Sequence, residues 1–155
     1  AYSLVGFTPD RDYRYVEINR MLRLFHGDAV ERVVGEITRL GGAVDRNPVT
    51  DLLTINNEFT ASVVVSRCRE TRGCSLRWKI RFDTGLAPDI TIAIRMDRAN
   101  EKALDYYLLP QFEMRSKPLG LAEENGLMLD AFRFETLDFL FEMVRRVPVS
   151  EVVPW

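Results

Sequence analysis

Hydrophobic and polar residues alternate strictly in two neighbouring stretches near the middle of the chain. Residues 76–82 read LRWKIRF, and residues 90–96 read ITIAIRM. A period of two is typical of strands in a sheet that has one apolar face and one solvated face. Antiparallel sheets are the kind that commonly leave one face in water. The short loop between the stretches contains Gly and Pro, so we expect an antiparallel hairpin that pairs Phe82 with Ile90.

Further strand-like runs lie on both sides of this hairpin. Residues 59–68 read FTASVVVSRC and residues 103–109 read ALDYYLL, and short turns join both runs to their neighbours. Residues 52–56, LLTIN, predict a short strand that forms a first hairpin with the 59–68 run. The sequence therefore predicts a sheet of four to five antiparallel strands.

The apolar faces of the four central runs can be aligned, and the alignment predicts their register. It sets Asp105 opposite Arg95 in one pair of strands and Arg77 opposite Arg95 in another. Val65 then lies opposite Ile80 on the apolar face. A slip of one residue would exchange the two faces of the sheet, so the register decides which basic residues meet water.

Apolar residues at helical spacing predict three helices around the sheet. The first covers about residues 12–25 and stops at Gly27. The second begins at Asp28, whose spacing to a following Glu resembles a capping box, and ends at Gly41. The third covers about residues 132–146. The first two are close enough for a helix-turn-helix, but a helical hairpin that packs on the sheet is the commoner arrangement.

These elements together predict the fold class α+β. We expect an antiparallel sheet of four to five strands, with two N-terminal helices and one C-terminal helix packed mainly on one face. The length of 155 residues suits one domain, and 46% hydrophobic with 28% charged residues is ordinary for a globular protein. We therefore expect a single domain over residues 1–155, cut from a longer protein if the initial Ala reflects processing.

Several classes of protein are disfavoured by what the sequence lacks. No apolar run approaches the ~20 residues that cross a bilayer, and no signal peptide is recognisable, so we expect a cytoplasmic protein without a membrane partner. Cys68, Cys74 and the distant His26 are too few for a tetrahedral zinc site. Two reduced cysteines, no metal and no cofactor are therefore the expectation.

Carboxylates near the ends of the two central strands leave one catalytic alternative open. Asp83, Asp89 and Asp97, with Lys79 one strand away, are the residue types with which a metal-dependent nuclease of restriction-endonuclease-like type holds a divalent ion. The acidic-x-Lys triplet of such sites is missing, since residues 95–97 read Arg-Met-Asp. Asp also collects in turns for conformational reasons alone. The sequence leaves catalysis undecided and favours a non-catalytic role.

The distribution of charge is the most unusual feature of the sequence. Residues 66–82 contain six basic residues against Glu70 alone, a net charge of +5, whereas the whole chain carries −2. The remainder therefore carries −7, and the calculated pI is about 5.5. A basic segment on an acidic domain gives its electrostatic field a direction.

The basic segment predicts a module that binds DNA or RNA through the solvated face of its sheet. An accessory domain of a larger DNA-processing protein is the setting that we expect for it. Arg suits phosphate because its planar fork donates two hydrogen bonds, and an aromatic ring can stack on a base. The candidate contacts are Arg67, Arg69, Arg77, Lys79, Arg81 and Arg95, with Tyr107 as the stacking ring. Two alternatives remain open: a protein domain that binds an acidic partner, and a solvated face laced with ion pairs, such as one from Asp105 to Arg95.

Overall fold

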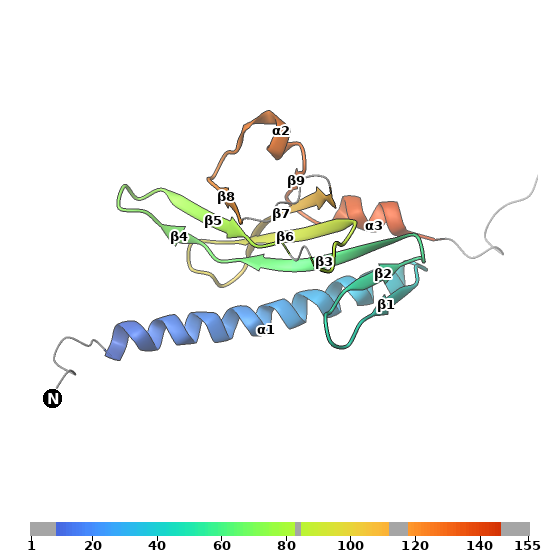
Figure 1. The fold of residues 1–155 in the computed structure, drawn as a ribbon, viewed down its shortest axis with the longest axis horizontal. Coiled ribbons are helices and arrows are strands. Elements are labelled where there is room, and N and C mark those ends of the chain that lie inside the picture. Colours follow the sequence, from blue (N-terminus) through green and yellow to red (C-terminus); the bar gives the residue numbers. More distant parts are fainter. Residues whose placement is uncertain (1–8, 83–84, 112–117, 147–155) are drawn as a thin grey trace, which may run out of the picture.

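A long helix and two β-sheets make up the protein in a computed structural model that describes residues 9–82, 85–111 and 118–146 (Figure 1). The helices are α1 (Pro9–Arg39), α2 (Gly126–Asp130) and α3 (Asp138–Val144). The strands are β1 (Val44–Arg46), β2 (Leu53–Ile55), β3 (Phe59–Ser66), β4 (Arg69–Glu70), β5 (Leu76–Ile80), β6 (Ile90–Met96), β7 (Ala103–Pro110), β8 (Leu119–Leu121) and β9 (Arg133–Phe134). Of the described residues, no helix is both long enough and apolar enough to cross a membrane.

The larger sheet has six strands in the order β1-β2-β3-β6-β7-β9. Its pairs are antiparallel except for β3 and β6, which run parallel. The parallel pair arises because the chain leaves this sheet after β3, builds β4 and β5, and returns in the same direction. The α+β class and the hairpin of β2 with β3 are confirmed, but the prediction of four to five strands, all antiparallel, is wrong.

Strand β5 belongs to a second sheet, in the order β4-β5-β8. Its residue Trp78 pairs with Leu121, so the predicted pairing of Phe82 with Ile90 is wrong. Arg77 lies opposite Arg69 instead of Arg95. The reason is that β8 forms in a stretch whose sequence suggested only a connection, and it provides β5 with a different edge.

The register between β6 and β7 agrees with the prediction from the apolar pattern. Asp105 lies opposite Arg95, and a bulge follows between Arg95 and Met96. The predicted pairing of Val65 with Ile80 is wrong, because Val65 lies opposite Ile94 in the parallel pair.

Helix α1 runs without interruption through Gly27 and Asp28, over 31 residues. The prediction of two N-terminal helices, and with it the helix-turn-helix, is therefore wrong. A glycine inside a helix costs only about 1 kcal/mol, which packing of the helix on the sheet can offset. The end near Gly41 is confirmed: φ is +88° there, and a Cβ would approach the carbonyl oxygen of Arg146 to 2.1 Å.

The C-terminal part is less helical than the sequence suggests. In place of one helix over about residues 132–146, the structure has strand β9 followed by the short helix α3. Helices α1 and α3 pack on the same face of the larger sheet, as predicted, while part of the segment that holds α2 packs with the opposite face. Residues 147–155 lie outside the described residues.

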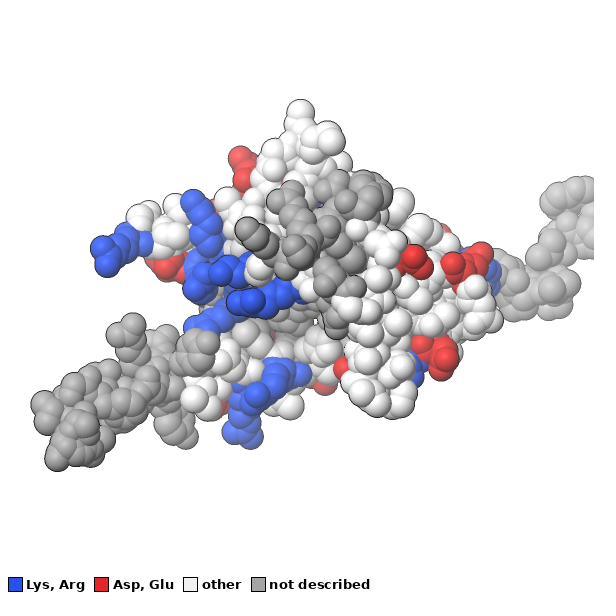
Figure 2. All heavy atoms as spheres, in the orientation of Figure 1, with Lys and Arg blue, Asp and Glu red and all other residues white. Residues whose placement is uncertain are grey.

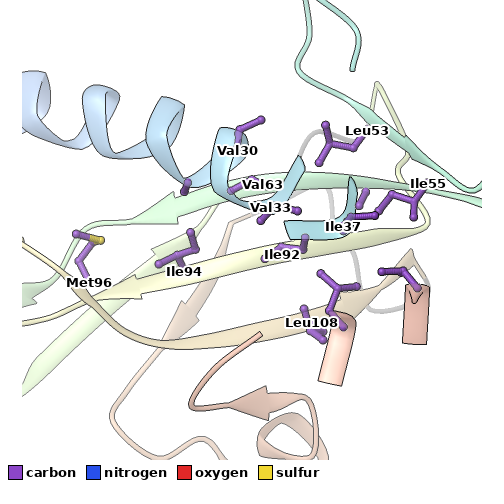
Figure 3. Packing of buried hydrophobic residues seen from close by; sticks show 14 residues of the cluster. Val30, Val33, Ile37, Leu53, Ile55, Val63, Ile92, Ile94, Met96 and Leu108 are labelled. Atoms are coloured by element: carbon purple, nitrogen blue, oxygen red, sulfur yellow. The ribbon is translucent and has the colours of Figure 1, made fainter. Parts of the chain in front are cut away.

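Two separate hydrophobic cores lie on the two faces of the larger sheet. The first joins α1 and α3 to the sheet, and Figure 3 shows residues of α1 such as Val33 and Ile37 directed toward the strands. The second lies under β5 and β8 and contains Trp78 and Ile80. Ile92 belongs to the first core, so the apolar faces of β5 and β6, which the sequence allowed to be aligned, do not meet in one core. Both faces of β6 are buried, and its alternating pattern does not reflect exposure to water.

We predict that Trp78→Ala destabilises the protein by about 3–5 kcal/mol, the range for large aromatic truncations in cores. The side chain is 2% exposed, and its Nε1 donates a 2.8 Å hydrogen bond to the carbonyl oxygen of Met96. Urea unfolding followed by circular dichroism measures the change. Val49→Ala is the control, because Val49 is 89% exposed and should change the free energy of unfolding by less than about 0.5 kcal/mol. Equal effects of the two substitutions would contradict the second core.

Candidate nucleic-acid interface

The basic residues of β5, and the one that directly follows it, are exposed. Arg77, Lys79 and Arg81 are exposed, while Trp78 and Ile80 between them are buried. Because successive side chains of a strand point to opposite faces, the buried residues hold the basic ones toward solvent. Figure 2 shows Lys and Arg side chains gathered on the side of the molecule where Figure 1 places β4 and β5.

A groove of about 430 Å³ lies between the N-terminal half of α1 and the strands β3, β4 and β5. Two residues of α1, Asn19 and Leu22, form one side, and Val64 and Val65 of β3 contribute apolar surface. The cations that line the groove are Arg67, Arg69, Lys79 and Arg81. Among the described residues that line it there is no carboxylate. The arrangement can hold an anion, and its field is positive on more than one side.

The open edge of β3 forms part of this groove. Strand β2 pairs with β3 only as far as Ala61, and no described strand forms a ladder with the edge beyond it, although β5 passes nearby. The carbonyl oxygen of Val63 accepts a 2.9 Å hydrogen bond from His26 Nε2, whereas the backbone N–H of Thr60 donates to Asp89 at the start of β6. Backbone groups alternate sides along a strand, so those of Val65 point to the open edge, as those of Val63 do.

Arg95 is buried and bonded inside the protein, contrary to its expected place on a solvated face. It is 2% exposed, and its Nε and Nη2 donate to the two carboxylate oxygens of Asp105 at 2.7 and 2.6 Å. The guanidinium lies 4.3 Å from the centre of the Trp78 ring, and Nη1 donates to the carbonyl oxygen of Ala122. Burial disfavours the charge, but the bonds to Asp105 raise the pKa of Arg95 above its usual value. The predicted ion pair is present, and the guanidinium has no access to a phosphate.

Tyr107 is also buried, at 0% exposure, so its ring is not available to stack on a base. Its hydroxyl donates a 2.5 Å hydrogen bond to Asp130 and accepts one from Asn125. Burial and the bond to Asp130 raise the pKa of Tyr107 to about 12. Tyr107 and Arg95 therefore fasten the segment from β8 to α2 onto the larger sheet.

Two carboxylates of the nuclease alternative, Asp89 and Asp97, lie at opposite ends of β6. Asp89 accepts hydrogen bonds from the backbone and hydroxyl of Thr60 at the start of β6. Asp97 accepts from backbone N–H groups in the turn after β6. Eight residues of extended chain separate the two, roughly 26 Å at the usual rise per residue. Asp83 lies outside the described residues, within which no group of three His, Cys, Asp or Glu side chains could hold a metal.

Other charges of the basic segment lie outside the groove. Arg77 borders a different hollow with Glu123 and Glu124, so the Glu-rich segment lies near this one cation. Arg72 is exposed in the turn of the hairpin. The contribution of α1 to the groove was missed from the sequence, because Asn19 and Leu22 carry no pattern that relates them to residues more than 40 positions later.

Comparisons with known proteins give one distant structural similarity. No family model matches the sequence, and no curated protein matches it. Among solved structures, the bacterial homing endonuclease I-Ssp6803I is similar at 15% sequence identity and a TM-score of 0.45, over 77% of this chain and 91% of that chain. The function proposed below therefore depends on this chain's own residues.

We predict that Asp105→Ala destabilises the protein by about 3–5 kcal/mol, because it leaves the buried guanidinium of Arg95 without its counter-charge. Replacing both residues by apolar ones, as in Arg95→Met with Asp105→Leu, should cost less than the single change. Thermal and urea unfolding of the unmodified protein, Asp105→Ala and the double variant measures the changes in the free energy of unfolding. A double variant less stable than Asp105→Ala would contradict the explanation.

We predict that alkaline titration detects Tyr107 as a late tyrosine. A raised pKa in the folded state means that its contribution to stability is complete below about pH 10 and is lost as pH rises through about 12. Tyrosinate absorbance near 295 nm follows the titration, and Tyr107→Phe should remove the component that forms near pH 12. If Tyr107→Phe leaves that component unchanged, the late titration belongs to another tyrosine and the raised pKa of Tyr107 is wrong.

Proposed function

We propose that the protein is a nucleic-acid-binding module and that the groove between α1, β3 and the β4–β5 hairpin holds the phosphate backbone. The observation that carries this proposal is the set of four cations around one groove, with no carboxylate among its described lining residues. Nucleic acids are the polyanions that such a surface attracts, since each neutralised phosphate releases counterions.

The charges of the hairpin are not balanced within the described part of the protein. Arg69 lies directly opposite Arg77, an arrangement that destabilises a strand pair. The one acidic residue of the segment, Glu70, pairs with Arg98, which lies outside it. Lys79 and Arg81 form no ion pair with a described carboxylate. These facts favour an external anion over a face laced with internal ion pairs.

The shape of the surface also suits a chain of phosphates. Lys79 of β5 and Arg81, just after the end of β5, both line the groove, and two positions of extended chain span about 7 Å. Arg67 and Arg69 add charge from the neighbouring segment. A row of cations along a strand matches a repeating anion better than a single small ion. Arg95 and Tyr107 are left out of the proposed interface because they are buried.

We predict that the protein binds DNA or RNA with an affinity that falls steeply with salt. Replacing Lys79 and Arg81 together by Ala should weaken binding to all sequences and reduce the slope of log K against log salt by up to about two units. Fluorescence anisotropy with a labelled oligonucleotide at several salt concentrations measures both effects.

The matched control is Arg32→Ala with Arg39→Ala, which removes the same charge from two exposed positions in the C-terminal half of α1. These two substitutions should have little effect on the affinity for nucleic acid or on its salt dependence. If it proves the sensitive pair, the groove is the wrong surface. If the unmodified protein binds neither DNA nor RNA even at low salt, nucleic-acid binding itself is wrong.

A further inference from the structure

We propose that the groove takes an unpaired strand of nucleic acid and that the open edge of β3 contacts its bases. The inference rests on the proposed function and goes beyond it, because phosphate binding alone does not distinguish a single strand from a duplex. Three properties of the groove carry the inference: its volume, its apolar surface and its free backbone edge.

The volume of the groove suits a nucleotide rather than a double helix. About 430 Å³ lies within the range of about 300–1,000 Å³ that is usual for sites that enclose small organic ligands. A base with its sugar can enter a space of this kind. A duplex keeps its bases stacked inside, so only its phosphates could reach the rim of the groove.

The apolar surface inside the groove is suited to the flat face of a base. Leu22 from α1 and Val64 and Val65 from β3 lie among the cations, where a purely ionic site would need no apolar side chains. Unpaired bases are held by apolar and aromatic contacts and by the planes of Arg guanidinium groups. Arg69 and Arg81 bring such planes to the same groove.

The open edge of β3 presents the chemistry that an unpaired base needs. The backbone N–H and C=O of Val65 point away from β6, toward the side that β2 leaves uncovered. An unpaired strand edge offers donors and acceptors, and the Watson–Crick edge of a base also combines them. Here the N–H and C=O of Val65 supply them, because the carbonyl oxygen of Val63 already accepts from His26. In a duplex these base edges are already paired. The strand edge therefore favours single-stranded nucleic acid.

Fluorescence anisotropy tests this inference with three labelled ligands. They are a 20-nucleotide single strand, the same strand in duplex form, and an abasic strand of equal length. At one salt concentration the single strand should bind about tenfold tighter than the other two, because stacking and edge contacts need an unpaired base. Poly-glutamate, a polyanion without bases, should compete poorly.

A substitution that reduces the volume of the groove without changing its charge distinguishes base binding from phosphate binding. Asn19→Met lengthens a side chain that lines the groove, changes no charge and keeps a good helix former. It should weaken single-strand binding by about tenfold while leaving the salt slope unchanged. Thr38→Met is the matched control, since Thr38 is an exposed residue at the far end of α1, and it should have no effect. Thermal unfolding should show both variants to be folded.

Three results would overturn the inference while leaving the proposed function intact. The first is a duplex that binds as tightly as the single strand and whose binding is weakened by replacing Arg72 and Arg77 with Ala. That result would indicate that the β4–β5 hairpin enters a groove of the duplex as a β-ribbon. The second is equal binding of the abasic strand or equal competition by poly-glutamate. The third is normal single-strand binding by Asn19→Met. Failure to bind any nucleic acid would overturn the proposed function as well.

Discussion

The buried pair of Arg95 and Asp105 holds the two layers of the protein together. The guanidinium of Arg95 lies between the larger sheet and the ring of Trp78, and it also donates hydrogen bonds to backbone carbonyls of the segment after β8. A buried ion pair adds little net stability compared with apolar residues of the same shape, but an unpaired charge there is costly. The pair therefore acts mainly by selecting one arrangement, in which β5 and β8 cover the face of β6 that carries Arg95.

This arrangement gives the basic surface its position. Trp78 and Ile80 are buried against the sheet, so the side chains between and after them must face away. They face the side along which α1 passes, and a groove forms there between helix and strands. The groove thus depends on the second core, although none of its cations belongs to that core.

The two buried residues that the alternating pattern assigned to a solvated face have a structural purpose. Arg95 and Tyr107 satisfy backbone and side-chain groups of residues 119–134, a segment that also buries Leu119 and Leu121 in the second core. Polar side chains under this segment give its backbone partners that water would otherwise supply. Nucleic-acid binding, as proposed, uses only the exposed members of the basic set.

The sequence by itself determined local features: the exposed row Arg77, Lys79 and Arg81, the hairpin of β2 with β3, the end of α1 near Gly41, and the register that sets Asp105 opposite Arg95. Each follows from side-chain periodicity or backbone preference over a few residues. Tertiary structure alone decided which sheet β5 joins, that α1 continues through Gly27, and that Arg95 is buried. A period of two shows that a strand has two different faces, but what covers each face depends on segments distant in the chain. The groove was hidden from the sequence for the same reason, because its two sides come from α1 and from strands more than 40 residues later.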